Sequence, residues 1–130
     1  MNDNETEAIE ATISELEPGM DSVNITFKVM DTSEERTVES RRNDETYRVI
    51  DAQVGDTTGT IQMPIWNDAI ETITVGETYT LLNGYTGLFR GNLQLKLGNR
   101  STIAVAEESI DEVNSEVDMS AEDHGSRSRY

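Results

Sequence analysis

Several residue types are absent or scarce in this chain of 130 residues, and each shortage narrows the chemistry that the chain can perform. There is no cysteine, which excludes disulfides and thiolate metal sites. The single histidine, His124, lies in a polar stretch, so a histidine metal site or a Ser/His/Asp triad has almost nothing to work with. We therefore expect no enzyme, no metal site and no cofactor.

Long apolar runs and aromatic residues are also scarce. No apolar run approaches the roughly 18 residues of a membrane span, and the acidic N-terminus lacks the basic region of a signal peptide, so we expect a cytoplasmic protein. Hydrophobic residues make up 35% of the chain, with one tryptophan, two phenylalanines and four tyrosines, which is low for a fully packed chain. The length suits one domain with loose ends.

Basic residues are outnumbered, since 10 lysines and arginines face 26 acids and give a net charge of -16. Such a charge opposes nucleic-acid binding unless it lies away from the binding surface. Residues 1–10 carry four acids and no base, and residues 107–130 carry eight acids and two arginines. Most of the negative excess therefore lies outside the middle of the chain.

The middle of the chain contains short segments in which apolar and polar residues alternate, as in half-buried strands. A long polar hairpin precedes the second strand, and a short helix between the third and fourth strands ends at Gly76. Five strands with one helix in this place give the order of an OB-fold, a partly open Greek-key barrel. The predicted strands cover residues 20–30, 47–54, 60–66, 78–85 and 92–97, the last with a continuation toward 105.

The fold class that follows is all-β, with a single OB-fold domain at residues 13–106. Residues 1–12 are predicted to form a flexible acidic N-terminus. Residues 107–130 have few apolar side chains and no sustained period, so we expect a disordered acidic tail that is free to bind protein partners.

Trp66 is the most informative residue, because strand alternation places its indole on the face opposite Ile61, Met63 and Ile65. An exposed indole is a stacking platform for a base. The alternative is that the ring packs under a loop or under the short helix, and periodicity alone does not decide between the two interpretations.

A glycine-rich turn after the fourth strand adds two aromatic residues, Tyr85 and Phe89. Arg90 and Lys96 lie in the same segment and could meet phosphates. An ordinary hairpin also explains one aromatic residue at a barrel end, but less readily two beside a cation. The polar hairpin supplies further arginines near the barrel opening, and together with the aromatics they predict a groove for single strands: Arg36, Arg41, Arg42 and Arg48.

Three segments, ISELEPGMDSVNITFKV, DAQVGDTTGTIQMPIWND and NGYTGLFRGNLQLKLG, together resemble the short archaeal single-stranded DNA binding proteins. These are related to the human SOSS-complex single-stranded DNA binding subunits and to replication protein A. The resemblance covers about residues 13–105 and implies that Trp66, Tyr85 and Phe89 stack on bases, with Arg90 at a place that a lysine or arginine usually holds. The acidic tail departs from the glycine- and arginine-rich tail of several relatives.

The resemblance implies a protein that binds and protects single-stranded DNA in replication, recombination or repair. Two alternatives stay open at this point. An OB barrel can instead bind RNA or tRNA, because stacking does not sense the 2′-hydroxyl. The barrel can also act as a protein-interaction subunit that binds no nucleic acid, with Trp66 buried in a partner.

Overall fold

The computed structural model describes residues 8–39, 42, 44–98 and 100–120. Its regular structure is almost entirely β-strand, which confirms the all-β class, and the helices of the described part are two short 3-10 turns. The elements in chain order are β1 (Ile9–Glu10), η1 (Ile13–Glu15), β2 (Val23–Thr32), β3 (Arg36–Glu39), β4 (Thr46–Asp56), β5 (Gly59–Trp66), η2 (Asn67–Thr72), β6 (Thr78–Phe89), β7 (Asn92–Lys96) and β8 (Thr102–Val105).

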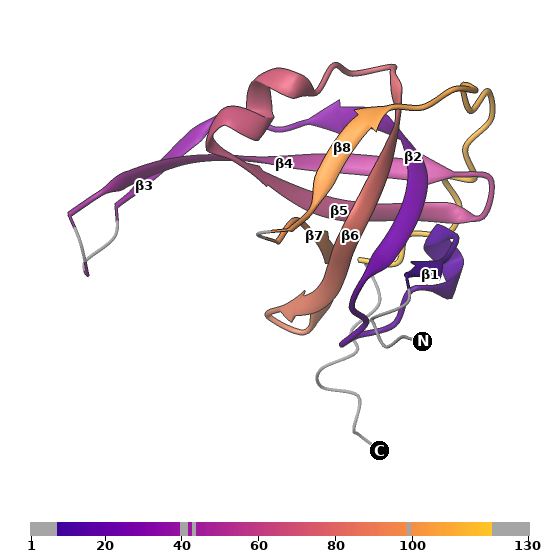
Figure 1. The fold of residues 1–130 in the computed structure, drawn as a ribbon, viewed down its shortest axis with the longest axis horizontal. Helices are drawn as coiled ribbons and strands as arrows, with labels where there is room; N and C mark the ends of the chain where they lie inside the picture. Colours follow the sequence, from indigo (N-terminus) through magenta and orange to yellow (C-terminus); the bar gives the residue numbers. More distant parts are fainter. Residues whose placement is uncertain (1–7, 40–41, 43, 99, 121–130) are drawn as a thin grey trace, which may run out of the picture.

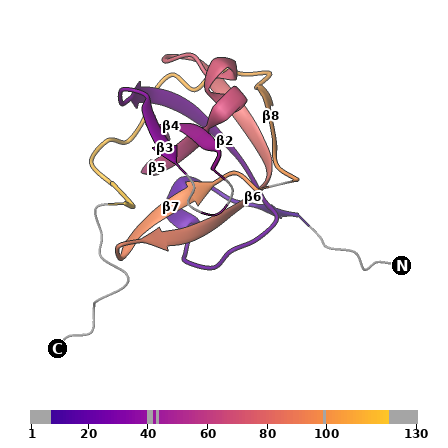
Figure 2. The same cartoon turned by 90° about the vertical axis from the view of Figure 1, so that its left-hand side faces the viewer.

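Five of these strands close into a barrel (Figures 1 and 2). The order around the barrel is β2-β4-β5-β7-β6, and β6 pairs back onto β2. Neighbouring strands run antiparallel except β5 and β7, which run parallel and, in the described chain, share the one pair Gln62 and Gln94. The barrel is thus unevenly closed, with a weak seam between β5 and β7. This strand order confirms the predicted five-stranded barrel.

The barrel core is built from the apolar halves of the alternating strands. On β2, every second residue from Val23 to Val29 is buried, and β5 and β7 contribute isoleucine, methionine and leucine in the same way. Phe27 is the largest fully buried side chain. Each buried leucine or isoleucine contributes about 1.5–3 kcal/mol by leaving water. Since each such strand buries one face, its other face remains available for a ligand.

The predicted polar hairpin over residues 31–46 contains a further strand, β3. Among the described strands it pairs with β4 alone, from Arg36 opposite Val49 to Glu39 opposite Thr46. Figure 1 shows β3 and the first half of β4 projecting from the barrel as an arm. Val49 also pairs with Trp66 of β5, so the base of the arm is continuous with the barrel wall.

The last predicted strand is divided in two. β7 ends at Lys96, and β8 then pairs with the first half of β6, from Tyr79 opposite Val105 to Leu82 opposite Thr102. The short helix between the third and fourth barrel strands is η2, and Gly76 beyond it has the positive φ of 97° that glycine tolerates best.

Both predicted loose ends are partly ordered. Within residues 1–12, β1 pairs in parallel with β2. Within residues 107–130, the part up to Ser120 packs on the barrel, because the main chain of Val117 and Met119 hydrogen-bonds to Thr60 at 2.7 and 2.8 Å. Met119 joins the core cluster. This segment has too few apolar residues to show a period of its own, but they suffice to dock it on the existing surface of the barrel. Residues 1–7 and 121–130 of the two predicted loose ends lie outside the described part.

The docked segment also closes the weak seam of the barrel. The Ser120 hydroxyl accepts a hydrogen bond from the main-chain N–H of Gln62 on β5 and donates one to the carbonyl of Leu93 on β7. One side chain thereby bridges the two strands that barely pair with each other. At Gly59, an added Cβ would lie 3.0 Å from Val117, so the absence of a side chain there lets the segment approach.

Candidate nucleic-acid interface

A groove of about 420 Å³ crosses the outer face of the barrel, a volume in the range of small-ligand pockets. It lies between the arm on one side and the β6–β7 hairpin on the other. Three of its lining residues are aromatic and two are cationic. The residues that line it are Arg36, Val38, Val49, Asp51, Gln62, Pro64, Trp66, Tyr85, Phe89, Gln94, Lys96 and Leu97.

Strand register explains why these residues meet. On β5, Gln62, Pro64 and Trp66 alternate with the buried Ile61, Met63 and Ile65, so they point away from the core. Their partners on β4 share that face, since residues paired across neighbouring strands point the same way: Val49 opposite Trp66 and Asp51 opposite Pro64.

The three predicted stacking residues all line this groove, and all are exposed. Trp66 is 42%, Tyr85 37% and Phe89 52% exposed, which excludes for the free chain the alternative that the indole is covered by a loop or by η2. The Tyr85 ring rests against Gly98, in the turn that follows β7, because its Cε1 atom lies 3.3 Å from the position that a Cβ on Gly98 would take. Each ring therefore presents apolar surface to the groove.

Arg90 and Gly91 form the two-residue turn between β6 and β7, and both have a positive φ, 56° and 86°. This is the pattern of a type I′ hairpin turn, whose twist matches that of the flanking strands. The Arg90 guanidinium lies 5.1 Å from the centre of the Phe89 ring, a cation–π contact. Arg90 thus lies at the groove's end, outside its lining, and covers one face of Phe89.

The charges of the groove differ from those of the whole chain. Lys96 extends along β6 so that its Nζ lies 3.7 Å from the position of a Cβ on Gly87, between Tyr85 and Phe89. Across the groove, Arg36 and Asp51 form an ion pair of 2.7 Å. The lining therefore carries two cations and one carboxylate, in a chain whose net charge is -16.

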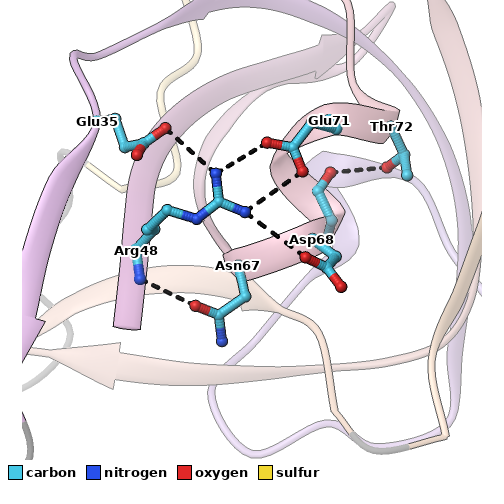
Figure 3. Close-up of polar contacts among 7 residues, drawn as sticks. Glu35, Arg48, Asn67, Asp68, Glu71 and Thr72 are labelled. Atoms are coloured by element: carbon cyan, nitrogen blue, oxygen red, sulfur yellow. Dashed lines mark hydrogen bonds and ion pairs between the residues drawn. The ribbon is translucent and has the colours of Figure 1, made fainter. Parts of the chain in front are cut away.

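Arg48 departs from the prediction that it faces the ligand. It alternates with Val49 and so projects to the other face of β4, where Figure 3 shows it among three carboxylates. Its guanidinium lies 2.8 Å from Glu71, 3.6 Å from Asp68 and 3.7 Å from Glu35. The Glu71 hydrogen bond raises the pKa of Arg48 and lowers the pKa of Glu71. The register of this strand was undetermined in the sequence, which is why its face was missed.

The two remaining predicted arginines, Arg41 and Arg42, come from the sequence between β3 and β4. Arg42 is exposed there and does not line the groove, and Arg41 lies outside the described residues.

Sequence reasoning missed several residues on the groove side of the arm and on the barrel floor. Arg36 was counted among the arginines of the polar hairpin, but its place on the groove face, like that of Val38, could have been found only with the register of the arm. Pro64 and Gln62 could have been predicted from the sequence, because the alternation that places Trp66 on the outer face of its strand places them there as well. The described part of the chain contains no cluster of metal-ligating side chains and no helix long and apolar enough to cross a bilayer.

The barrel order and the groove over its second and third barrel strands define an OB-fold protein. The sequence model of the OB-fold family of Ssb-like single-stranded DNA binding proteins matches residues 16–105. The chain belongs to this family. The single-stranded DNA binding protein Ssb of Saccharolobus solfataricus is 33% identical over 100 residues, which is 77% of this chain and 66% of that protein.

Solved structures show the same fold. A hypothetical protein of Arabidopsis thaliana superposes with a TM-score of 0.77 at 20% identity, over 100% of this chain and 95% of that chain. The replication factor A related protein of Methanobacterium thermoautotrophicum superposes with a TM-score of 0.63 at 24% identity, over 76% of this chain and 92% of that chain.

Proposed function

We propose that this protein binds single-stranded DNA in the groove, by stacking bases on Trp66, Tyr85 and Phe89, and that it protects the strand during replication, recombination or repair. The observation that carries the proposal is the gathering of the three exposed rings with a lysine and an arginine in one groove, from four different strands. Membership of the Ssb-like family supports the choice of single-stranded DNA.

Stacking supplies most of the binding free energy in this proposal. A base stacked on an aromatic side chain contributes about 1–3 kcal/mol whatever its identity, because every base has a π-face. A duplex keeps its bases stacked on one another, so it cannot offer them to the three rings. The groove should therefore select unpaired strands without selecting sequence.

Phosphate contacts have a smaller part. Lys96 lies inside the groove and Arg90 at its end, so a strand that follows the groove passes both. Arg42 lies outside the lining and would meet only a strand that extends along the arm beyond the groove. Arg36 adds a cation on the arm side, although Asp51 already neutralises much of its charge. Arg48 is paired with Glu71 of η2 on the other face of β4 and does not serve the ligand.

The test measures the affinity of the full chain for labelled single-stranded DNA, for RNA of the same sequence and for duplex DNA. We expect single-stranded DNA to bind most tightly and duplex most weakly. Trp66→Ala should weaken single-strand binding by about 1–3 kcal/mol, and Trp66→Phe should restore part of it. Tighter binding of RNA would identify an RNA-binding protein, and no binding to any oligonucleotide would identify a protein-interaction subunit.

A further inference from the structure

The floor of the groove holds a buried amide that has no hydrogen-bond partner among the described residues. Five buried residues in the described part of the chain carry polar or charged side chains: Asp56, Thr60, Thr78, Thr86 and Gln94. The carboxylate and the three hydroxyls each hydrogen-bond to main-chain groups. The Gln94 side chain is 5% exposed, lines the groove and has no hydrogen bond to any other residue that the structure describes.

An unpartnered buried amide opposes folding, because it loses its hydrogen bonds to water and gains none in return. Native proteins keep few such groups, and each calls for an explanation. The amide of Gln62, which is half-buried and also lines the groove, likewise makes no side-chain hydrogen bond within the described residues. Gln62 and Gln94 are direct partners across the seam between β5 and β7. Two adjacent amides thus line the groove, and no described residue uses their donors and acceptors.

The position of Gln94 matches the edge of a stacked base. It pairs with Gly87 of β6, which lies between Tyr85 and Phe89 on the same outer face. Strand side chains stand roughly perpendicular to their sheet, so a base stacked against one of these rings also stands on the floor and turns an edge toward it. Gly87 has no side chain to block that approach.

We propose that Gln94 and Gln62 form a site for the Watson–Crick edge of an unpaired nucleobase; this inference rests on the proposed stacking function. A side-chain amide offers two N–H donors beside one carbonyl acceptor. Thymine presents a carbonyl beside an N–H on its edge and can pair with this set through two hydrogen bonds. A rotation of the amide by 180° exchanges donor and acceptor and suits the reversed pattern of cytosine or adenine.

The consequence is a second reason for rejecting duplexes, independent of stacking. In a duplex the Watson–Crick edge is already paired, so it cannot satisfy the two amides. In the free protein, water can hydrogen-bond to part of these amide groups, and the incoming base replaces this water with directed hydrogen bonds. Gln94 is then a specificity-determining residue for unpaired bases, although it selects no sequence.

The experiment compares two oligonucleotides of equal length, one of thymidine and one in which difluorotoluene replaces thymine. The analogue has the shape of thymine and stacks, but it lacks the hydrogen-bonding edge. Wild type should bind thymidine about tenfold more tightly, and Gln94→Met should abolish this preference by weakening thymidine binding alone. The same substitution should raise the unfolding temperature by a few degrees, since it removes an unpartnered buried amide.

The matched control is Gln53→Met, the same change at an exposed position of β4 that does not line the groove. It should keep the full preference for thymidine. If Gln94→Met fails to fold, Gln62→Met serves the same comparison and should lose most of the preference. Equal binding of the two oligonucleotides by wild type, or an unchanged preference in the variants, would overturn the proposed edge site.

A failure of the proposed function gives a different result. Trp66→Ala weakens binding of both oligonucleotides equally if stacking holds, because both can stack. If Trp66→Ala binds both like wild type, the stacking function itself is wrong. If it weakens both while Gln94→Met keeps the preference, stacking stands and only the edge site is rejected.

Discussion

Docking of residues 107–120 on the barrel makes Met119 a structural residue, although it lies far beyond the domain boundary that the sequence predicts. Met119 is 8% exposed and belongs to the core cluster, and its N–H donates to the carbonyl of Thr60 at 2.8 Å. Truncation of a buried methionine to alanine costs about 2–5 kcal/mol. Because Met119 lies at the margin of the core, we expect Met119→Ala to cost about 2 kcal/mol.

Thermal unfolding followed by circular dichroism measures this cost. At about 4 °C per kcal/mol for a domain of this size, Met119→Ala should lower the midpoint by about 8 °C. Val105→Ala is the control, because Val105 is 69% exposed and should shift the midpoint by less than about 2 °C. A chain that ends at residue 120 should have the same unfolding midpoint as the full chain. A chain that ends at residue 106 should lose the Ser120 hydrogen bonds between β5 and β7 and unfold at a lower temperature. Equal midpoints for Met119→Ala and wild type would refute the docking of this segment.

Three further predictions concern the groove and the Arg48–Glu71 ion pair on the other face of β4. Tyr85→Ala and Phe89→Ala should each weaken single-strand binding by about 1–3 kcal/mol in a fluorescence anisotropy titration and leave stability intact. Ile61→Ala should instead cost about 2–5 kcal/mol of stability, because Ile61 faces the core. If Tyr85→Ala or Phe89→Ala unfolds the protein, these rings are structural. The slope of log affinity against log salt concentration should be about 3 or less in magnitude. Lys96→Ala should reduce this slope by about 0.7, and Arg48→Ala should leave it unchanged. A slope near 8 would show that phosphate contacts, and not stacking, dominate the binding free energy. The lowered pKa of Glu71 implies that its bond to Arg48 stabilises the fold above the ordinary carboxyl pKa of 4.5 and that this increment is lost as pH falls through the lowered value. Wild type should therefore be more stable than Glu71→Gln at neutral pH, by a difference that shrinks as the solution is acidified. A stability difference that does not change with pH would contradict the assigned pair.

The barrel and the exposure of Trp66 could be predicted because both depend on alternation within a single strand. On β5, the buried Ile61, Met63 and Ile65 place Trp66 outside without any knowledge of its neighbours. The same local rule identified the outward direction of Lys96. Periodicity therefore suffices wherever one strand alone decides which way a side chain points.

The face of Arg48 and the docking of Met119 could not be predicted in this way, because they depend on pairing between distant segments. Shifting a strand by one residue moves every side chain to the opposite face, and the polar arm gives no apolar pattern to fix its register. Met119 stands in a segment with too few apolar residues to fold alone, and it is buried only because the barrel already offers an apolar edge.

The central claim is that an unpaired base stacks on Trp66, and the fluorescence of this single tryptophan reports it directly. Titration of the full chain with single-stranded DNA should quench the emission in a saturable way, and duplex DNA at the same concentrations should quench it far less. Oligonucleotide binding should saturate in both the fluorescence and an independent anisotropy assay at the same concentration. Saturated binding in the anisotropy assay with unchanged tryptophan emission would contradict the account, because the strand would then be held away from the groove.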